Sequence, residues 1–310
     1  MTTNEHSHAN SAYMTLAPLG VLHVEGEDGQ SLLQNLLTND VDALAINQSQ
    51  ITGLCNPKGR LLAIFLLVRR HNRYQLILPK TMCAGLKQRL SMYILRSKVT
   101  ISDVSDSIFC MGLSSATGIS SLTLPDESYQ ATEHNDSVII KYPSSQPRFL
   151  FIGPTAEVNT LISELAEQQW QVATPSQWEL LDMEAGLPMI WPETKEQFTT
   201  QQVNLDLVNG VSFKKGCYPG QEIVARLHYL GTPSRRMFQG EVQTQNSVEI
   251  GDEVTSDNGN IAGHVVRVEH KNKNTLLMLL SLKLSAVNLG VFVHHNEQVT
   301  IINNIIAEEQ

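Results

Sequence analysis

The amino-acid sequence predicts an α+β fold that ends in a small all-β domain. Residues 14–230 mix amphipathic helical patterns with short apolar runs of strand length. From Met237 onward the chain contains only short β-rich runs, which turns such as Asp257-Asn258-Gly259 divide. Helices mixed with hairpins favour an α+β arrangement, and successive short strands favour a barrel or sandwich.

The N-terminal half predicts strands and two helices. Asp28 can N-cap a helix that ends at Leu37, because its leucines share one face. Residues 81–95 form a second amphipathic pattern, and residues 114–136 read as a loop whose strand content the pattern leaves open. The expected strands are two within 13–26, the hairpin 61–68 and 74–78, and then 99–101, 108–113, 138–142 and 149–152.

The middle of the chain predicts two more helices and a domain boundary. Thr155 caps a helix that runs to about Trp170, and Ser176 with Glu179 fits a capping box for the next helix. A chain of 310 residues favours two or three domains. We expect a disordered polar tail at 1–13, an α+β region at 14–230, and a C-terminal β-barrel domain at 231–310.

Charge and hydropathy exclude several classes of protein. A net charge of -9 disfavours a long nucleic-acid groove, which needs many Lys and Arg residues. The longest apolar run, 61–68, is too short to span a membrane, and the N-terminus lacks the apolar core of a secretory signal. These features predict a cytoplasmic protein in a reducing compartment.

The four cysteines divide into two kinds. Cys55, Cys83 and Cys110 lie in apolar or strand-like surroundings, so we expect buried, inert thiols. No C-x-x-C pair occurs, which disfavours a zinc ribbon or a local iron–sulfur site, and we expect no bound metal. Cys217 differs because it lies in a segment rich in glycine and lysine.

The segment 213–222 carries the strongest chemical signal. Gly216 and Gly220 allow tight turns, and Pro219 suits the first position of a helix. Cys217 would then precede a helix N-terminus, with Lys214 and Lys215 close by, and each feature favours thiolate over thiol. The residues alone leave a second interpretation open, in which Cys217 is a small turn residue beside two solvated lysines.

The string K-G-C-Y-P-G-Q-E resembles the signature K-G-C-Y-x-G-Q-E of the YgfZ family of folate-binding proteins. In this sequence the signature comprises Lys215, Gly216, Cys217, Tyr218, Gly220, Gln221 and Glu222. Supporting positions are Gly26, Asp28, Leu33, Gln34, Thr38, Asn39 and Asp40, then Arg96-Ser97-Lys98-Val99, and Glu184-Ala185-Gly186 with Pro188. The resemblance covers residues 14–230 well and the C-terminal domain only loosely.

The resemblance implies a fold like that of the glycine-cleavage aminomethyltransferase, with domains around a central folate pocket. It implies two interleaved subdomains, the inner one near 50–105, and tetrahydrofolate or a derivative as the ligand. It also implies that Lys215 and Cys217 act in the maturation of iron–sulfur enzymes, including a radical tRNA methylthiotransferase. The expected partners are iron–sulfur enzymes or assembly proteins, without stable direct binding of nucleic acid or membrane, and we expect a monomer.

Three residues are expected to bind the folate. The resemblance places Glu184 against the pterin edge and Trp178 against its ring, and it places Leu19 where the family can show a second Trp. Two of them have a structural alternative, since Glu184 can be an exposed helix-end charge and Trp178 a core residue.

Three alternative functions compete with this one. A true aminomethyltransferase would need acids where the chain has Ala63 and Ile64, so its acid–base group is missing. A thiol hydrolase would need a histidine base. The available histidines are His228, His264, His294 and His295, and none has a supporting motif. A non-catalytic folate sensor or scaffold stays open.

Overall fold

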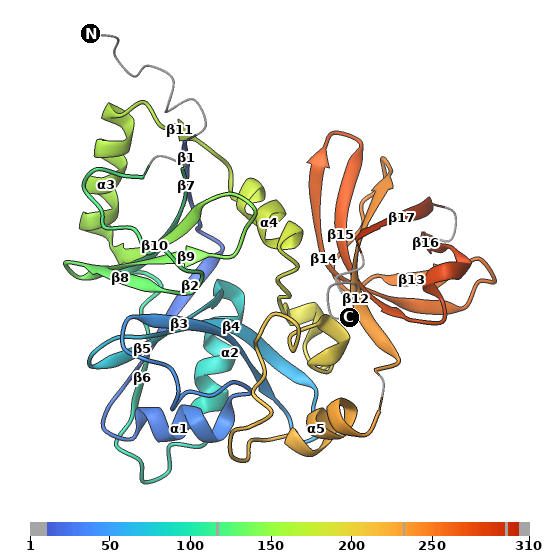
Figure 1. Cartoon of the computed structure of the whole chain (residues 1–310), viewed down its shortest axis with the longest axis horizontal. Helices are drawn as coiled ribbons and strands as arrows, with labels where there is room; N and C mark the ends of the chain where they lie inside the picture. The colour runs from blue at the N-terminus through green and yellow to red at the C-terminus, as the bar shows by residue number, and fades with distance from the viewer. Residues whose placement is uncertain (1–10, 116–117, 232, 295–296, 304–310) are drawn as a thin grey trace. The chain divides into compact units, whose positions relative to one another are not determined.

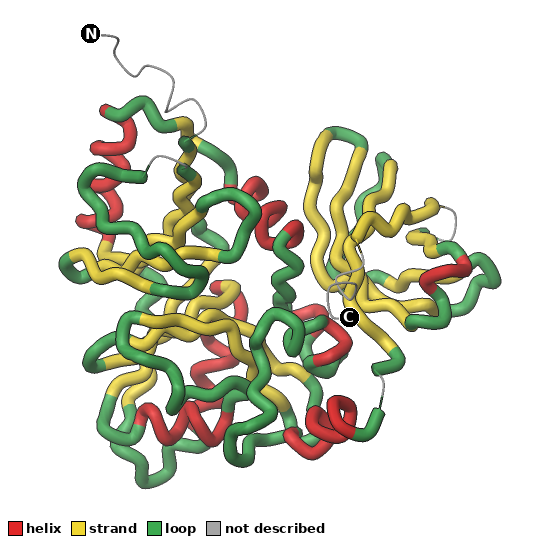
Figure 2. Tube along the Cα trace, viewed as in Figure 1, coloured by secondary structure: helices red, strands yellow, loops and turns green. Residues whose placement is uncertain are grey.

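The computed structural model describes residues 11–115, 118–231, 233–294 and 297–303, with three sheets and five α-helices in these residues (Figures 1 and 2). By their contacts, the residues form two compact units that interleave along the chain. The first comprises residues 1–32, 42–50 and 66–178, and the second comprises 33–41, 51–65 and 179–310.

A six-stranded sheet belongs to the first unit. Its strands, in spatial order, are β11 (Gln171–Val172), β1 (Ala12–Thr15), β7 (Ile108–Ser114), β10 (Arg148–Pro154), β9 (Ser137–Tyr142) and β8 (Ala131–His134). Phe149 and Phe151 of β10 face the helix α3 (Thr155–Glu167), which contributes Leu161 to the same apolar cluster. Leu150 and Ile152 enter a different cluster, because successive side chains of a strand point to opposite faces.

A five-stranded sheet has the order β3 (Gln48–Cys55), β4 (Leu61–Arg69), β5 (Arg73–Pro79), β2 (Leu19–Glu25) and β6 (Thr100–Asp103). Strand β4 is buried along almost its whole length, as its continuous apolar run predicts. The helix α1 (Gly29–Leu36) follows β2, and the helix α2 (Lys80–Ser91) follows β5 and packs on β2 and β6.

The C-terminal strands close into a six-stranded barrel. Their order is β12 (Arg235–Gln243), β15 (Thr275–Lys283), β14 (Ile261–Asn272), β13 (Glu253–Ser256), β16 (Val291–Val293) and β17 (Glu297–Asn303). The barrel core is aliphatic and includes Val265, Met278 and Leu280. Before the barrel lie the helices α4 (Pro175–Glu184) and α5 (Gln221–Tyr229) and two short 3-10 turns, Pro192–Thr194 and Gln201–Val203; a third, Val287–Leu289, lies between β15 and β16. The predicted α+β class with a C-terminal barrel is confirmed.

Four local predictions need correction. Strand β1 already includes Ala12 and Tyr13, whereas residues 1–10 of the predicted tail lie outside the described residues. The helix α2 ends at Ser91, several residues early, and the chain continues as turns in which Leu95 adopts a positive φ of 42°. Strand β3 was not expected at all, and Thr155 is the first residue of α3, whose N-cap is Pro154. Strand β8 lies within residues 114–136, whose strand content the sequence left open.

Candidate functional site

The residues Lys215 to Tyr218 form a turn before α5 in which two exposed residues lie between two buried ones. Lys215 and Tyr218 are buried, whereas Gly216 and Cys217 are exposed. The turn therefore presents the thiol of Cys217 to solvent between two inward-pointing side chains. A β-carbon added at Gly216 would have no other heavy atom within 4 Å, so the space beside this residue of the turn is open.

Lys215 anchors the turn to the end of α1. Its ammonium donates hydrogen bonds to the carbonyl oxygens of Gln34, Leu37 and Asn39 at 2.6, 2.7 and 2.9 Å. The ring of Tyr218 lies 5.5 Å from the same nitrogen, within the range of a cation–π contact. An ammonium has three hydrogens to donate, and three carbonyls accept here. Carbonyls at a helix C-terminus lack partners within the helix, so a cation stabilises this end.

Gly220 fixes where the turn meets the loop between β3 and β4. It adopts a left-handed conformation with φ of 83°, which glycine tolerates best. A β-carbon at Gly220 would lie 2.5 Å from the carbonyl oxygen of Asn56 and 2.7 Å from the Cα of Gly59. Any side chain here would separate the two loops, so the glycine is required by close packing.

The helix α5 starts later than the sequence suggested. Gly220 is its N-cap and Gln221 its first residue, so Pro219 precedes the helix instead of occupying its first position. The left-handed Gly220 interrupts the helical geometry that would have included Pro219. Glu222 is exposed in the first turn, where a carboxylate favours the positive end of the helix.

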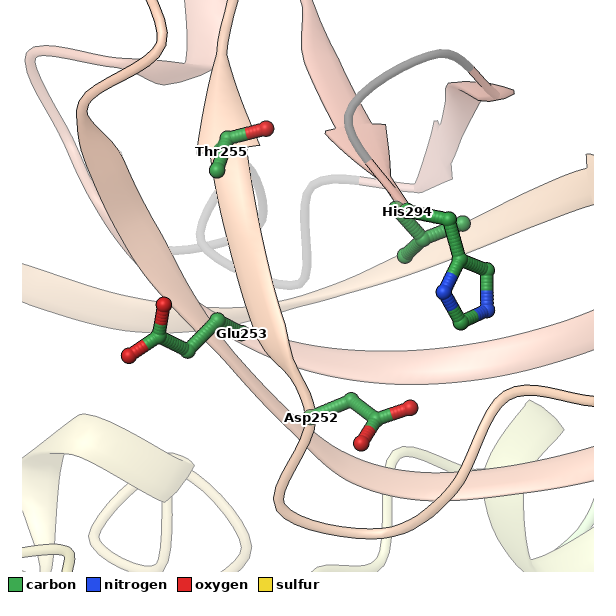
Figure 3. A pocket seen from close by; sticks show the side chains of 5 residues that line it. Asp252, Glu253, Thr255 and His294 are labelled. Atoms are coloured by element: carbon green, nitrogen blue, oxygen red, sulfur yellow. The ribbon is translucent and has the colours of Figure 1, made fainter.

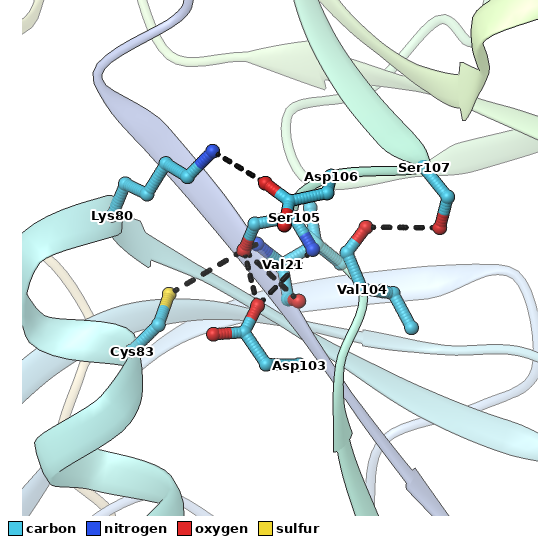
Figure 4. Close-up of polar contacts among 8 residues, drawn as sticks. All are labelled: Val21, Lys80, Cys83, Asp103, Val104, Ser105, Asp106 and Ser107. Atoms are coloured by element: carbon cyan, nitrogen blue, oxygen red, sulfur yellow. Dashed lines mark hydrogen bonds and ion pairs between the residues drawn. The ribbon is translucent and has the colours of Figure 1, made fainter.

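The other three cysteines are buried, as predicted. Burial raises the pKa of the Cys55 thiol to about 12, that of Cys110 to about 12 and that of Cys83 to about 11. Cys83 lies within a polar network in which Ser105 contacts its sulfur and accepts a hydrogen bond from the Val21 N–H (Figure 4). Such thiols stay protonated near neutral pH, so Cys217 is the accessible thiol of the chain.

Three of the four histidines considered as a base for Cys217 have other partners in the structure. His228 stacks on Phe213, with ring centroids 3.6 Å apart and planes 9° apart. His264 packs edge-on against Phe198, and burial lowers its pKa. His294 bonds the carbonyl of Ser247, and His295 lies outside the described residues. These contacts give no support to a histidine base for Cys217.

The end of α4 is held by two barrel residues that sequence reasoning missed. The amide of Gln239 donates hydrogen bonds to the carbonyls of Met183 and Glu184 at 2.7 and 2.9 Å. Arg267 is almost fully buried, pairs with Glu179 and Asp182, and bonds the Leu187 carbonyl at 2.9 Å. The two bonds from Gln239 satisfy the last two carbonyls of α4, which lack partners within the helix.

Glu184 is exposed at the end of this clamped helix. Among the described residues no cation lies within ion-pair distance of its carboxylate, although Lys271 is near enough for Glu184 to help raise the pKa of that lysine, after the larger effect of Glu241. A carboxylate on a fixed backbone, without an ion-pair partner, can accept hydrogen bonds from a ligand.

Trp178 and Leu19 share one apolar cluster, but their exposure differs. Trp178 is 2% exposed, whereas Leu19 is only partly buried against the cluster. The guanidinium of Arg148 lies 4.5 Å from the indole centroid, and the Tyr142 ring lies 5.3 Å from it. A β-carbon at Gly112 would lie 2.5 Å from the indole, so this glycine makes room for it. Trp178 therefore packs as a core residue.

The barrel carries a polar cavity of about 220 Å³, lined by Asp252, Glu253, Thr255, Val293 and His294 (Figure 3). Its side chains come from β13, the residue before it and the end of β16. Among the residues that the structure describes, no group of three or more His, Cys, Asp or Glu side chains is arranged to hold a metal ion.

No family model matches the chain. The tRNA-modifying protein YgfZ of Edwardsiella ictaluri is 33% identical over 223 residues, which cover 70% of this chain and 67% of that protein. The chain belongs to the YgfZ family. The YgfZ protein of Photorhabdus laumondii is 32% identical over 230 residues (73% and 69% of the two chains), and that of Hamiltonella defensa is 27% identical over 297 residues (94% and 85%).

The fold comparison agrees with the YgfZ signature. The aminomethyltransferase T of the glycine cleavage system from Bartonella henselae superposes with a TM-score of 0.77, covering 96% of this chain and 86% of that chain at 16% identity. The predicted aminomethyltransferase-like fold is therefore confirmed. In this YgfZ chain Ala63 and Ile64 lie buried within β4, where neither can act as an acid or base. No described helix is long and apolar enough to cross a membrane.

Proposed function

We propose that this chain is a cytoplasmic, folate-binding accessory protein that uses the thiol of Cys217 to support iron–sulfur enzymes and, through one of them, tRNA modification. The observation that carries the proposal is the contrast between the exposed Cys217 and three buried cysteines. The names of the relatives support the connection with tRNA. The clamped turn supports a defined position for the thiol, as a reactive group requires.

Lys215 has a positioning role in this proposal. Its three carbonyl bonds fix the backbone two residues before Cys217, and they engage every hydrogen of the ammonium. The lysine thus acts on the thiol through the shape of the turn. Gly220 and Tyr218 act in the same way, since one fits against Asn56 and the other is buried.

The ligand we propose is tetrahydrofolate or a derivative. The resemblance to folate-binding proteins and the aminomethyltransferase fold support it. The exposed carboxylate of Glu184 fits the donor-rich edge of a pterin, because charged acceptors pair well with adjacent N–H donors. Folate when bound would supply one-carbon or electron chemistry, and Glu184 would orient its ring.

Trp178 and Leu19 have different parts in the proposed folate site. The burial of the indole means that Trp178 supports the site by packing, through the cluster that also carries Leu19. Leu19 is the more accessible of the two and can contact a ligand directly. A branched aliphatic side chain offers less stacking area than an aromatic ring.

Selective alkylation tests the function. Because three thiols are buried, iodoacetamide should add one adduct to the native protein, at Cys217. Alkylated and untreated protein are then added to an extract of cells that lack this protein, and the activity of an iron–sulfur enzyme is measured. We expect restoration by the untreated protein only. Equal restoration by protein carrying the single adduct would refute the proposed role of Cys217. Folate binding by the alkylated protein is the control for folding.

A further inference from the structure

A cavity of about 320 Å³ lies in the first unit, between the turn that joins β4 to β5 and the start of α1. Its lining is rich in cations and includes Arg69, Arg70, His71, Asn72 and Arg73. Neither the family signature nor the proposed folate residues belong to it. The concentration of arginines is unusual for a protein whose net charge is -9.

The pairing of these arginines leaves positive charge uncompensated. Arg70 is buried and forms an ion pair with Glu133 at 3.1 Å. Arg69 bonds the carbonyl of Leu44 at 2.7 Å and has no carboxylate within ion-pair distance among the described residues. Arg73 forms a long ion pair with the part-exposed Glu25 at 4.0 Å, and the Nε of Arg73 is buried without a hydrogen-bond partner.

The remaining lining residues do not cancel this charge. Glu27 is the acid in the lining, and it pairs with Lys98 at 2.7 Å. The pKa of His23 falls to about 4, first because the ring is buried and then because the charges of Arg73 and Arg70 disfavour its protonated form. The charges of Arg73 and Arg70 that contribute to this shift also attract an anion to the cavity that both residues line.

We propose that this arginine cavity binds the phosphate group of a small phosphate monoester. Arg69 has no carboxylate within ion-pair distance among the described residues, and the ion pair of Arg73 with Glu25 is long. Both guanidinium groups can therefore attract a phosphate monoester, which carries about -1.5 to -2 at neutral pH. Guanidinium groups match phosphate oxygens with paired hydrogen bonds. The buried Nε of Arg73 is one donor that the ligand would satisfy. The cavity leaves space beside the phosphate for part of the molecule that carries it.

Titration of the full-length protein with inorganic phosphate, and separately with a nucleoside monophosphate, tests the proposal by calorimetry. We expect saturable binding at one site for both. Arg73→Gln and Arg69→Gln should each weaken it about tenfold or more, since a hydrogen bond to a charged group contributes roughly 1.5–3 kcal/mol. Arg226→Gln, which removes an exposed arginine of α5 outside the cavity, should leave the affinity within about twofold.

The imidazole signals of His23 provide a readout that nonspecific binding would not move. A bound phosphate should raise the pKa of His23 from about 4, because an anion favours the protonated ring. The absence of saturable binding would overturn the proposal. So would equal weakening by Arg226→Gln, or binding that leaves the His23 titration unchanged. Tight binding of an RNA oligonucleotide without binding of inorganic phosphate or the nucleoside monophosphate would assign the arginines to a nucleic-acid backbone instead.

Discussion

The ammonium of Lys215 donates a hydrogen bond to the carbonyl oxygen of Leu37 at 2.7 Å, although 178 positions separate the two residues in the sequence. This bond and its two companions join the signature turn to the end of α1. The buried lysine thereby explains why a basic residue stands two positions before the exposed thiol. Its ammonium donates hydrogen bonds to backbone carbonyls, which would otherwise lack a donor.

Lys215→Met should destabilise the protein by roughly 2–3 kcal/mol, because three carbonyls would lose a charged donor in a buried place. Lys214→Met is the matched control, since Lys214 is exposed and its loss should change stability by less than about 0.5 kcal/mol. Urea denaturation measures both. Equal stability of the two variants would show that the carbonyl bonds contribute nothing.

Stability should fall as pH drops from about 6.5 to 4, partly because of His23. Its pKa is about 4 in the folded protein, against 6.5 for an ordinary histidine. Between these values the unfolded chain binds a proton that the folded chain does not, so acid favours unfolding. The contribution is complete above pH 6.5. His23→Gln should flatten this part of the curve, which urea denaturation at each pH measures.

Glu184→Ala should weaken tetrahydrofolate binding by roughly 1.5–3 kcal/mol, the usual cost of losing a charged hydrogen-bond partner. Quenching of tryptophan fluorescence measures the affinity. Glu222→Ala removes another exposed glutamate and should bind as the wild type does. If Glu184→Ala binds equally well, the pterin is held by other residues. Trp178→Phe should lower stability more than affinity, because the indole is buried.

Bulk tRNA should bind weakly, and added salt should abolish the binding. The basic cluster near the signature comprises Lys214, Lys215, Arg226, Arg235 and Arg236. Two of them are already engaged, since Lys215 bonds carbonyls and Arg236 bonds both carboxylate oxygens of Asp206 at 2.7 and 2.8 Å. A gel shift at physiological salt checks this. Tight binding that survives raised salt and is lost in Arg226→Gln would establish direct recognition of tRNA.

The fold class could be predicted because strands and helices leave local patterns. The continuous apolar run of β4 and the short C-terminal strands were visible in the sequence. Strand β3 was missed because residues 48–50 are polar or exposed and its apolar pattern begins late. Tertiary pairing, with Leu37 against Leu54, helps to fix it.

The site could be predicted only in part for a similar reason. The burial of Cys55, Cys83 and Cys110 followed from their apolar neighbours, which are local in sequence. The partners of Lys215 are more than 170 positions away, and so no pattern near the signature could reveal them. Gln239 and Arg267, which hold the end of α4, lie in barrel strands far along the chain. The sequence pattern around α4 therefore could not reveal them either.

Complementation of a strain that lacks this protein tests the central claim most directly. Wild type, Cys217→Ala and Cys217→Ser are expressed at equal levels, and methylthio-modified tRNA is quantified by mass spectrometry. Because Cys217 is exposed, both substitutions should leave the fold intact. We predict that wild type restores the modification and that neither variant does. Full restoration by Cys217→Ala would contradict the claim that this thiol carries the function.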